Sequence, residues 1–258
     1  MYAVKIDNLN FNFGNKVLFK NLNLKIKTNT WNTILGNNGA GKTTLLKIIV
    51  GLIESDNIFI DNIKLNKSNK LDIRKKIGCV FENVENNLVC DTVLEELSFP
   101  LENLGLSQEE IELRIDNIIN LFDYLPDKNQ SIDSLTIDEK QVLAIMVSLI
   151  YNPKILILDE AFSYANKLKK IQVMNILKKL NITIINVTHD AEELLYSDNI
   201  IVLKDGNVFM NDTIDNVFKD DKIDNLPFIV ELSKKLKYYE LVDDISYSYK
   251  ELVEKIWK

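Results

Sequence analysis

Residues 36–44 carry the glycines, the lysine and the hydroxyl groups of a loop that wraps phosphate groups. In order they are Gly36, Asn37, Asn38, Gly39, Ala40, Gly41, Lys42, Thr43 and Thr44. They fit G-x-x-x-x-G-K-[ST], in which backbone N–H groups cradle the phosphates of a nucleotide. In this pattern Lys42 reaches the β- and γ-phosphates and the Thr43 hydroxyl binds Mg²⁺. The alternative interpretation is a glycine-rich turn beside a solvated lysine.

The sequence around this loop predicts the strand and the helix that the pattern needs. Residues 31–35 form a β-prone run, residues 44–50 have the length and apolar face of a helix, and Gly51 would end that helix. The N-terminus of the helix would direct its dipole and its free N–H groups at the anion. This context favours a nucleotide-phosphate site over a simple turn.

An acidic pair follows a buried strand. Residues 155–158 are a continuous apolar run, which is typical of a strand covered on both faces of a parallel sheet, and Asp159 and Glu160 come directly after it. Open α/β sheets bind ligands at the carboxyl ends of such strands. Asp159 is placed to hold Mg²⁺, and Glu160 to polarise a water molecule against the γ-phosphate. The alternative is an N-cap for the next helix.

His189 is the only histidine of the chain, and it follows the next apolar run, residues 182–187. A lone histidine is more often structural than catalytic. Here it ends a strand that should lie in the same sheet as residues 155–158, where it could reach the γ-phosphate.

Strand and helix patterns alternate along the chain, which predicts an α/β fold with a mixed sheet. Strands are predicted at 4–6, 22–26, 31–35, 57–60, 77–81, 155–158 and 182–187, a turn at 11–15, and helices at 44–50, 107–122, 135–151 and 168–180. The helix at 107–122 opens with a capping box, Ser107 to Glu110. From about residue 216 the sequence becomes polar, with short amphipathic helices, one of which follows a second predicted capping box, Ser248 to Glu251.

Composition excludes several classes of function. The 258 residues carry a net charge of -7, whereas a nucleic-acid-binding surface would be basic, so we expect no nucleic-acid partner. The longest apolar stretch, 142–151, is about half the length of a membrane-spanning helix. Residues 1–7 lack the apolar segment of a secretory signal. Cys79 and Cys90 show no metal-binding spacing.

Together these motifs resemble the ATPase subunits of ABC transporters. The resemblance covers residues 4 to about 211 and implies binding and hydrolysis of ATP with Mg²⁺. It makes residues 36–44 the Walker A loop and 155–160 the Walker B strand. It also implies that Phe13 stacks on adenine and that His189 is the switch histidine.

Other segments are similar to the ATPases of energy-coupling factor (ECF) transporters. They are residues 80–87, 92–99, 226–236 and 249–253. This resemblance implies an ATPase domain at 1–215, a helical subdomain at about 83–150, and a C-terminal helical appendage at 216–258 that serves dimerisation. It implies a transmembrane coupling subunit, a substrate-binding membrane subunit, and a position at the cytoplasmic face of the membrane. The transported substrates would be vitamins or other micronutrients.

Two segments depart from the family pattern. Where the family has Leu-Ser-Gly-Gly-Gln, residues 135–139 read Leu-Thr-Ile-Asp-Glu, and residues 163–166 read Ser-Tyr-Ala-Asn in place of Ser-Ala-Leu-Asp. The family lends both segments to the nucleotide of the opposite subunit. At ~5 Å and an effective dielectric constant of ~20, each carboxylate–phosphate pair would cost roughly 3 kcal/mol. We therefore expect a heterodimer in which the second ATPase has an intact signature motif.

Glu82 stands where the family has the glutamine of the Q-loop, and its carboxylate could still bind Mg²⁺. Acidic residues continue through this segment, interleaved with apolar ones: Glu82, Glu85, Asp91, Glu95 and Glu96 with Val84, Leu88, Val93 and Leu97. The pattern predicts a partner with arginine-bearing, partly apolar helices, or simply a solvated helix face. Two alternative functions remain open: a regulatory subunit with little hydrolysis, and an ABC ATPase outside transport.

Overall fold

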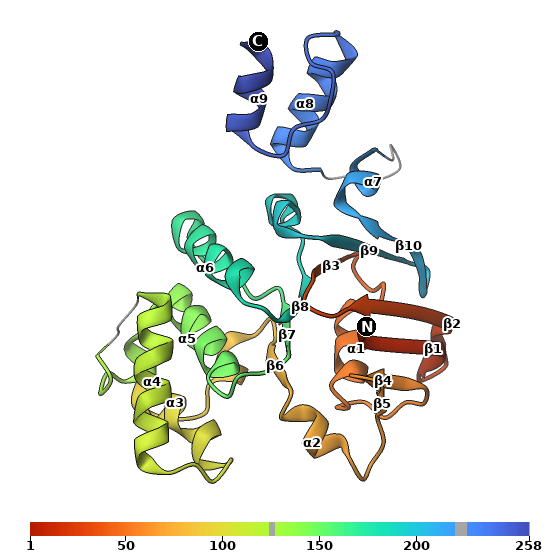
Figure 1. Ribbon diagram of the computed structural model, residues 1–258. Helices are drawn as coiled ribbons and strands as arrows, with labels where there is room; N and C mark the ends of the chain where they lie inside the picture. The colour runs from red at the N-terminus through yellow and green to blue at the C-terminus, as the bar shows by residue number, and fades with distance from the viewer. Residues whose placement is uncertain (124–126, 220–225, 258) are drawn as a thin grey trace.

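The structure, a computed structural model, describes residues 1–123, 127–219 and 226–257. The strands are β1 (Tyr2–Phe13), β2 (Lys16–Lys27), β3 (Trp31–Leu35), β4 (Ile58–Ile60), β5 (Ile63–Lys64), β6 (Ile77–Val80), β7 (Ile155–Asp159), β8 (Thr183–Val187), β9 (Asn199–Lys204) and β10 (Asn207–Thr213). The α-helices are α1 (Lys42–Ile49), α2 (Lys70–Arg74), α3 (Val93–Glu102), α4 (Gln108–Phe122), α5 (Ile137–Leu149), α6 (Lys167–Lys179), α7 (Ile214–Lys219), α8 (Phe228–Tyr238) and α9 (Tyr249–Ile256). Short 3₁₀ helices are η1 (Val84–Asn87), η2 (Ile132–Ser134) and η3 (Ala191–Tyr196). Figure 1 shows their arrangement.

A mixed sheet in the order β10-β9-β3-β8-β7-β6 forms the centre of the molecule. Its inner pairs are parallel, and only β10 joins antiparallel, to β9. All five residues of β7 and of β8 are buried, as their continuous apolar runs predict. Because parallel strands end at the same edge, the segments after β3, β6, β7 and β8 gather there. This confirms the predicted α/β class with a mixed sheet.

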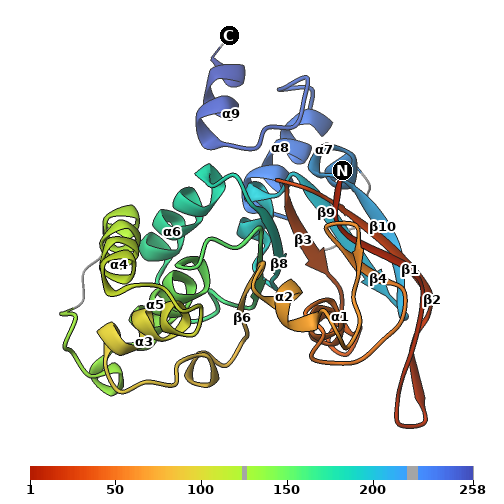
Figure 2. The ribbon, with the colours of Figure 1, turned by 60° about the horizontal axis from the view of Figure 1, so that its bottom comes forward.

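A separate antiparallel sheet, in the order β2-β1-β4-β5, covers α1 from the other side. Its β1–β2 hairpin is much longer than the strands predicted at 4–6 and 22–26, and the prediction of a turn at 11–15 is wrong for its first part. Residues 11–13 continue β1, and the turn lies at Gly14 and Asn15. Figure 2 shows the hairpin extending past the rest of the sheet.

Asparagines explain why the hairpin was underestimated. Asn10 Oδ1 accepts a hydrogen bond from the N–H of Asn21, and Asn23 Oδ1 accepts one from the N–H of Asn8. Asn8 and Asn21 both have positive φ, so these side chains support the backbone where the strand register shifts. Residues that usually signal turns therefore occur inside a strand pair.

Helices α3, α4 and α5 pack together beside β6 and β7 and share one apolar core. The predicted capping box at Ser107 is present, and Thr92 with Glu95 forms another at the start of α3. Helix α5 begins at Ile137, two residues later than predicted, because Leu135 and Thr136 are extended.

The C-terminal segment forms α7, α8 and α9 over the β9–β10 end of the sheet. Apolar residues of all three helices pack with Leu194 and Ile200 of the central domain. At the start of α9, Ser248 accepts from the N–H of Glu251, but the Glu251 carboxylate accepts from the N–H of Tyr247. The second predicted capping box is therefore displaced by one residue. Of the predicted appendage, residues 220–225 and 258 lie outside the described part.

Within residues 1–123, 127–219 and 226–257, no helix is long and apolar enough to cross a membrane.

Candidate active site

The loop between β3 and α1 has glycines where a side chain could not fit. A Cβ on Gly36 would lie 2.6 Å from the carbonyl oxygen of Leu203, and one on Gly41 would lie 2.7 Å from the ring of Phe19. Gly41 and Gly39 also have φ angles of +97° and +80°. Glycine adopts these conformations without strain and lets the backbone of the loop approach an anion closely.

Several of the remaining loop residues are exposed. Asn37, Asn38 and Gly39 are exposed, and the N–H of Ala40 donates to the carbonyl of Asn37 at 3.0 Å. Thr44 lies in the first turn of α1. The predicted loop residues thus lie between the end of β3 and the first turn of α1.

The side chain of Lys42 folds back onto the start of this loop. Its Nζ donates to the carbonyl of Gly36 at 2.7 Å and lies 3.4 Å from the carbonyl of Asn37. Burial lowers the pKa of Lys42, while the charges of Glu160 and Asp159 oppose that shift. The ammonium group therefore lies between the phosphate loop and the acidic pair, in position to neutralise an anion.

Asp159, Thr43 and Glu82 form a site that fits a hard cation. Asp159 is 1% exposed, and among the described residues its Oδ2 has no hydrogen-bond partner. Burial raises the pKa of Asp159, a hydrogen bond with Thr43 opposes the shift, and the charge of Glu82 adds to it. A buried carboxylate oxygen without a partner, beside a hydroxyl and a second carboxylate, suits Mg²⁺, which usually takes few protein ligands and completes its shell with phosphate and water.

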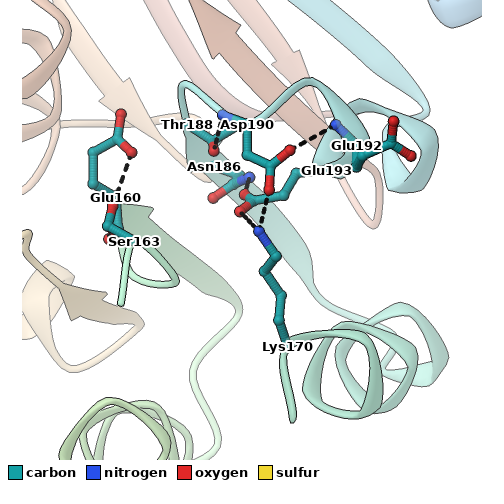
Figure 3. Close-up of polar contacts among 8 residues, drawn as sticks. All are labelled: Glu160, Ser163, Lys170, Asn186, Thr188, Asp190, Glu192 and Glu193. Carbon is teal, nitrogen blue, oxygen red and sulfur yellow. Dashed lines mark hydrogen bonds and ion pairs between the residues drawn. The ribbon is translucent and has the colours of Figure 1, made fainter. Parts of the chain in front are cut away.

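Glu160 lies next along the chain, with a φ of +53°, which is uncommon for a residue with a side chain. Its N–H donates to the carbonyl of Val187 on β8 at 2.9 Å. Ser163 Oγ donates to Glu160 Oε2 at 3.1 Å (Figure 3). His189 Nε2 lies 3.3 Å from Glu160 Oε1 without completing a hydrogen bond, so the two form an ion pair when the imidazole is protonated.

Burial raises the pKa of Glu160, and the charge of His189 and the Ser163 hydrogen bond lower it. A carboxylate that is largely buried, accepts a hydrogen bond from a hydroxyl and lies beside an imidazole suits a base that orients water. The side chain of His189 is 56% exposed and can therefore approach a ligand.

Phe13 lies at the end of the hairpin and is 71% exposed. Two residues earlier, Phe11 pairs with Phe19, whose ring lies against Gly41. At about 3.3 Å per residue, Phe13 is displaced roughly 7 Å along the strand from that contact. An exposed aromatic ring at this distance from the phosphate loop is available to stack on a base, and that role stays a prediction.

The acidic side chains of residues 135–139 form hydrogen bonds and an ion pair within the chain. Glu139 Oε2 accepts from the N–H of Thr136 at 2.9 Å, and Asp138 Oδ1 accepts from the Thr136 hydroxyl at 2.7 Å. Asp138 Oδ2 accepts from Asn166 Nδ2 at 3.0 Å and lies 4.0 Å from Lys169 Nζ. The Thr136 hydrogen bond is the main cause that lowers the pKa of Asp138, so this side chain stays ionised at neutral pH.

Sequence reasoning missed three residues around the site: Ser163, Lys170 and Glu193. Ser163 could have been recognised from its place three residues after Glu160, since short polar side chains commonly bond back over that distance. Lys170 and Glu193 lie 23 residues apart and meet only through the fold. No local pattern would have found them.

Comparison with known proteins agrees with this geometry. The family described as ABC transporter matches residues 19–163. The chain is 34% identical to the energy-coupling factor transporter ATP-binding protein EcfA1 of Oenococcus oeni, over 100% of this chain and 98% of that protein.

Two solved structures share the fold. One is cbiO1 from Clostridium perfringens, described as part of the ABC transporter complex cbiONQ, with a TM-score of 0.79 and 31% identity over 92% of this chain and 95% of that one. The other is the dimeric ATP-binding cassette MJ0796 bound to ADP and Pi, with a TM-score of 0.73 and 31% identity over 82% of this chain and 98% of that one. The chain therefore belongs to the ABC transporter family, as an ATP-hydrolysing ABC ATPase similar to the energy-coupling factor ATP-binding proteins.

Proposed function

We propose that this chain hydrolyses Mg²⁺-ATP to energise an ECF-type importer of vitamins or other micronutrients, as one half of an asymmetric ATPase pair on the cytoplasmic face of the membrane. One observation carries the hydrolysis: the phosphate loop, Asp159, Glu160 and His189 meet at one edge of the central sheet. Residues 1–215 are proposed as the ATPase domain, with the helical subdomain at about 83–150.

Each side chain has a role that its surroundings support. The N–H groups of residues 36–44 and the Lys42 ammonium hold the phosphates. Thr43 and Asp159 would hold Mg²⁺, with Glu82 beside them, and the ion would supply positive charge to the phosphate oxygens.

Hydrolysis itself needs a base and a group that responds to the γ-phosphate. Glu160, oriented by Ser163, aligns a water molecule and accepts its proton. His189 contacts the γ-phosphate and couples its presence to Glu160.

The asymmetric pair is inferred from residues 135–139. Helix α5 begins here, and the N-terminus of a helix favours an anion. Two carboxylates, of Asp138 and Glu139, occupy the first turn, and Ile137 is 47% exposed beside them. A γ-phosphate bound by the opposite subunit would meet negative charge and an apolar side chain. The site built from this segment should bind nucleotide but turn it over poorly, whereas the phosphate loop of this chain would face an intact signature.

A membrane partner is inferred from the region after β6. A cavity of about 340 Å³ is lined by Val89, Cys90, Asp91, Glu95, Phe99 and Glu102. Val89 is 70% and Phe99 is 47% exposed, so apolar and acidic groups alternate at one surface. An arginine-bearing, partly apolar helix of a transmembrane coupling subunit suits this surface. That coupling subunit would in turn join a substrate-binding membrane subunit.

Pairing of the two ATPases is proposed for the C-terminal appendage, residues 216–258. Its exposed aromatic side chains support this proposal: Tyr238 is 82%, Tyr239 is 70% and Trp257 is 84% exposed. Such side chains, concentrated on one small unit, are typical of a surface that a partner covers.

The test is Mg²⁺-dependent ATP hydrolysis by the purified chain, alone and mixed with a second ATPase subunit, with and without Glu160→Gln. Activity that appears only in the mixture and is lost with Glu160→Gln supports the proposal. Activity in the mixture that survives the substitution would show that this chain only holds nucleotide, as the regulatory alternative requires. Mutating the general base of each subunit in turn tests the asymmetry, and equal losses would overturn it.

A further inference from the structure

Helix α6 sends one lysine to the segment that carries His189. Lys170 Nζ forms an ion pair with Asp190 and donates to Glu193 Oε1 at 3.0 Å (Figure 3). The side chain of Lys170 is 13% exposed and that of Glu193 is 4% exposed. A single ammonium group is therefore buried between two carboxylates that belong to the loop and the turn after β8.

The Asp190 carboxylate holds the backbone on one side of His189. Asp190 Oδ1 accepts from the N–H of Glu192 at 2.9 Å and so starts η3. The N–H of Asp190 donates to Thr188 Oγ1 at 3.0 Å, which closes a turn around His189. Thr188 and Asp190, which flank His189, are thus hydrogen-bonded to each other, and Asp190 is also paired with Lys170.

Glu193 holds the other end of the segment. Its Oε2 accepts from Asn186 Nδ2 at 3.0 Å, and Asn186 lies in β8 opposite Leu158. The Lys170 ammonium is consequently connected to the strand before His189 through Glu193, and to the loop after it through Asp190. Glu160 and His189 line a cavity of about 880 Å³, and Lys170, Asp190 and Glu193 line the same cavity.

We propose that Lys170 is a positioning residue that holds the segment 186–193 so that His189 stays against Glu160. The proposal rests on the proposed hydrolytic function and assigns it a residue on α6 whose partners are the carboxylates of Asp190 and Glu193. Without Lys170, Asp190 and Glu193 would be like charges in partly buried surroundings, and their repulsion would separate them. Asp190 is bonded to the backbone after His189, and Glu193 is bonded to Asn186 in β8. Their separation would therefore displace His189.

The electrostatics of the cluster agree with this role. Burial alone would lower the pKa of Lys170, but hydrogen bonds and charges from Asp190 and Glu193 outweigh it and raise the pKa. For Asp190, burial acts to raise the pKa, but the hydrogen bonds from Lys170 and from the N–H of Glu192, together with the charges of Lys170 and Lys167, outweigh burial and lower the pKa. The ammonium and the carboxylate therefore stabilise each other's charged form.

Another lysine on the same helix provides a control. Lys178 Nζ donates to Asp198 Oδ1 at 2.6 Å and to the carbonyl of Tyr196 at 2.8 Å. It joins α6 to the far end of η3 through one carboxylate and one carbonyl, without a bond to the turn around His189. Lys178→Met removes a more exposed ion pair on the same helix, with side chains 40% and 46% exposed, so it reports what the loss of an α6 ion pair away from the turn around His189 does.

The experiment compares Lys170→Met, Lys170→Arg and Lys178→Met with the unchanged chain, each mixed with the second ATPase subunit. For Lys170→Met we expect kcat to fall about tenfold or more, while the KM for ATP changes less than about twofold, since nucleotide contacts remain. Lys170→Arg keeps the cation and should recover most of the rate, and Lys178→Met should leave kcat unchanged. Equal effects of Lys170→Met and Lys178→Met, or a changed KM with an unchanged kcat, would overturn the proposal.

A second measurement needs no ATPase activity. His189 is the only histidine, so its imidazole signals in the NMR spectrum of the isolated chain are unambiguous. We expect them to move in Lys170→Met and to stay in place in Lys178→Met, with thermal unfolding recorded for both. Unmoved signals in a folded Lys170→Met chain would refute the positioning role. A different outcome is that the His189 signals move in Lys170→Met while the unsubstituted chain shows no ATPase activity in any mixture. That outcome would support the positioning role and refute the proposed function.

Discussion

The side-chain amide of Asn166 donates to Asp138 Oδ2 at 3.0 Å and joins the start of α6 to the first turn of α5. Both residues lie where this chain departs from the family pattern. An aspartate at position 166, as in the family pattern, would put two carboxylates in contact, whereas asparagine supplies a donor. Asn166 also caps α6, since its Oδ1 accepts from the N–H of Lys169 at 2.9 Å. The two departures therefore complement each other physically.

Asn166→Asp should destabilise the chain by about 1–3 kcal/mol, because it replaces a hydrogen bond to a charged group with a contact between like charges. Aspartate is an equally good N-cap, so the cap itself should survive. The double substitution Asp138→Asn with Asn166→Asp reverses the donor and the acceptor and should recover most of the loss. Urea unfolding of the three variants measures this. A double variant no more stable than Asn166→Asp would show that the pair does not interact in this way.

The ionised carboxylate of Asp138 predicts a pH dependence. The pKa of Asp138 is lowered in the folded chain, chiefly by the Thr136 hydroxyl, so its stabilising effect is present above the ordinary pKa of 3.8 and is lost as the pH falls through the folded pKa. The unchanged chain should be more stable than Asp138→Asn at pH 6–8, and the difference should shrink as the pH approaches 3. Unfolding midpoints of both proteins across this range check the sign. A difference that grows toward acid pH would contradict it.

The phosphate loop offers a matched pair of glycines for a third prediction. Both Gly39 and Gly41 have positive φ, but a Cβ at Gly39 would meet open space, whereas one at Gly41 would meet the Phe19 ring. Gly39→Ala should cost about 1–2 kcal/mol from backbone strain. Gly41→Ala should cost a further 1–3 kcal/mol from overpacking. Thermal unfolding separates the two variants, and nucleotide titration should show weaker binding for both. Equal stabilities would indicate that Phe19 moves away without loss.

The sequence was sufficient for the parts of the site that follow one another along the chain. The strand, the loop and the helix around Lys42 are local, and the apolar runs before Asp159 and His189 identify buried parallel strands. Their meeting at one edge then follows from the parallel arrangement.

The remaining features depend on contacts between distant segments. The bond between Asn166 and Asp138 spans 28 residues, and that between Lys170 and Glu193 spans 23. No periodic pattern in the sequence indicates either pair. Each residue, considered alone, is typical of a helix cap or a surface charge. The β1–β2 hairpin is longer than predicted for a different reason, since asparagines that usually end strands stabilise its irregular register.

Glu96 allows a test of the surface proposed for the membrane partner. It is 2% exposed, and its Oε2 accepts from the N–H groups of Val89 and Cys90, both at 2.8 Å. Glu96→Ala would leave both N–H groups without this acceptor, so the loop that presents Val89 should move, and the chain should lose about 1–3 kcal/mol of stability. Glu96→Gln keeps an oxygen that can accept and should retain most of the stability.

The expected result for Glu96→Ala is weaker capture of the transmembrane coupling subunit, with ATP hydrolysis by the soluble ATPase mixture preserved. This follows because Glu96 holds the loop at Val89 and Cys90, which are not among the residues proposed to bind the nucleotide. Glu109→Ala, an exposed acidic residue in the first turn of α4, is the control and should change neither property. Co-purification with the membrane subunits and ATPase assays on the same samples measure both. If Glu96→Ala binds the membrane subunits as well as Glu109→Ala does, the loop at Val89 and Cys90 is not part of the docking surface.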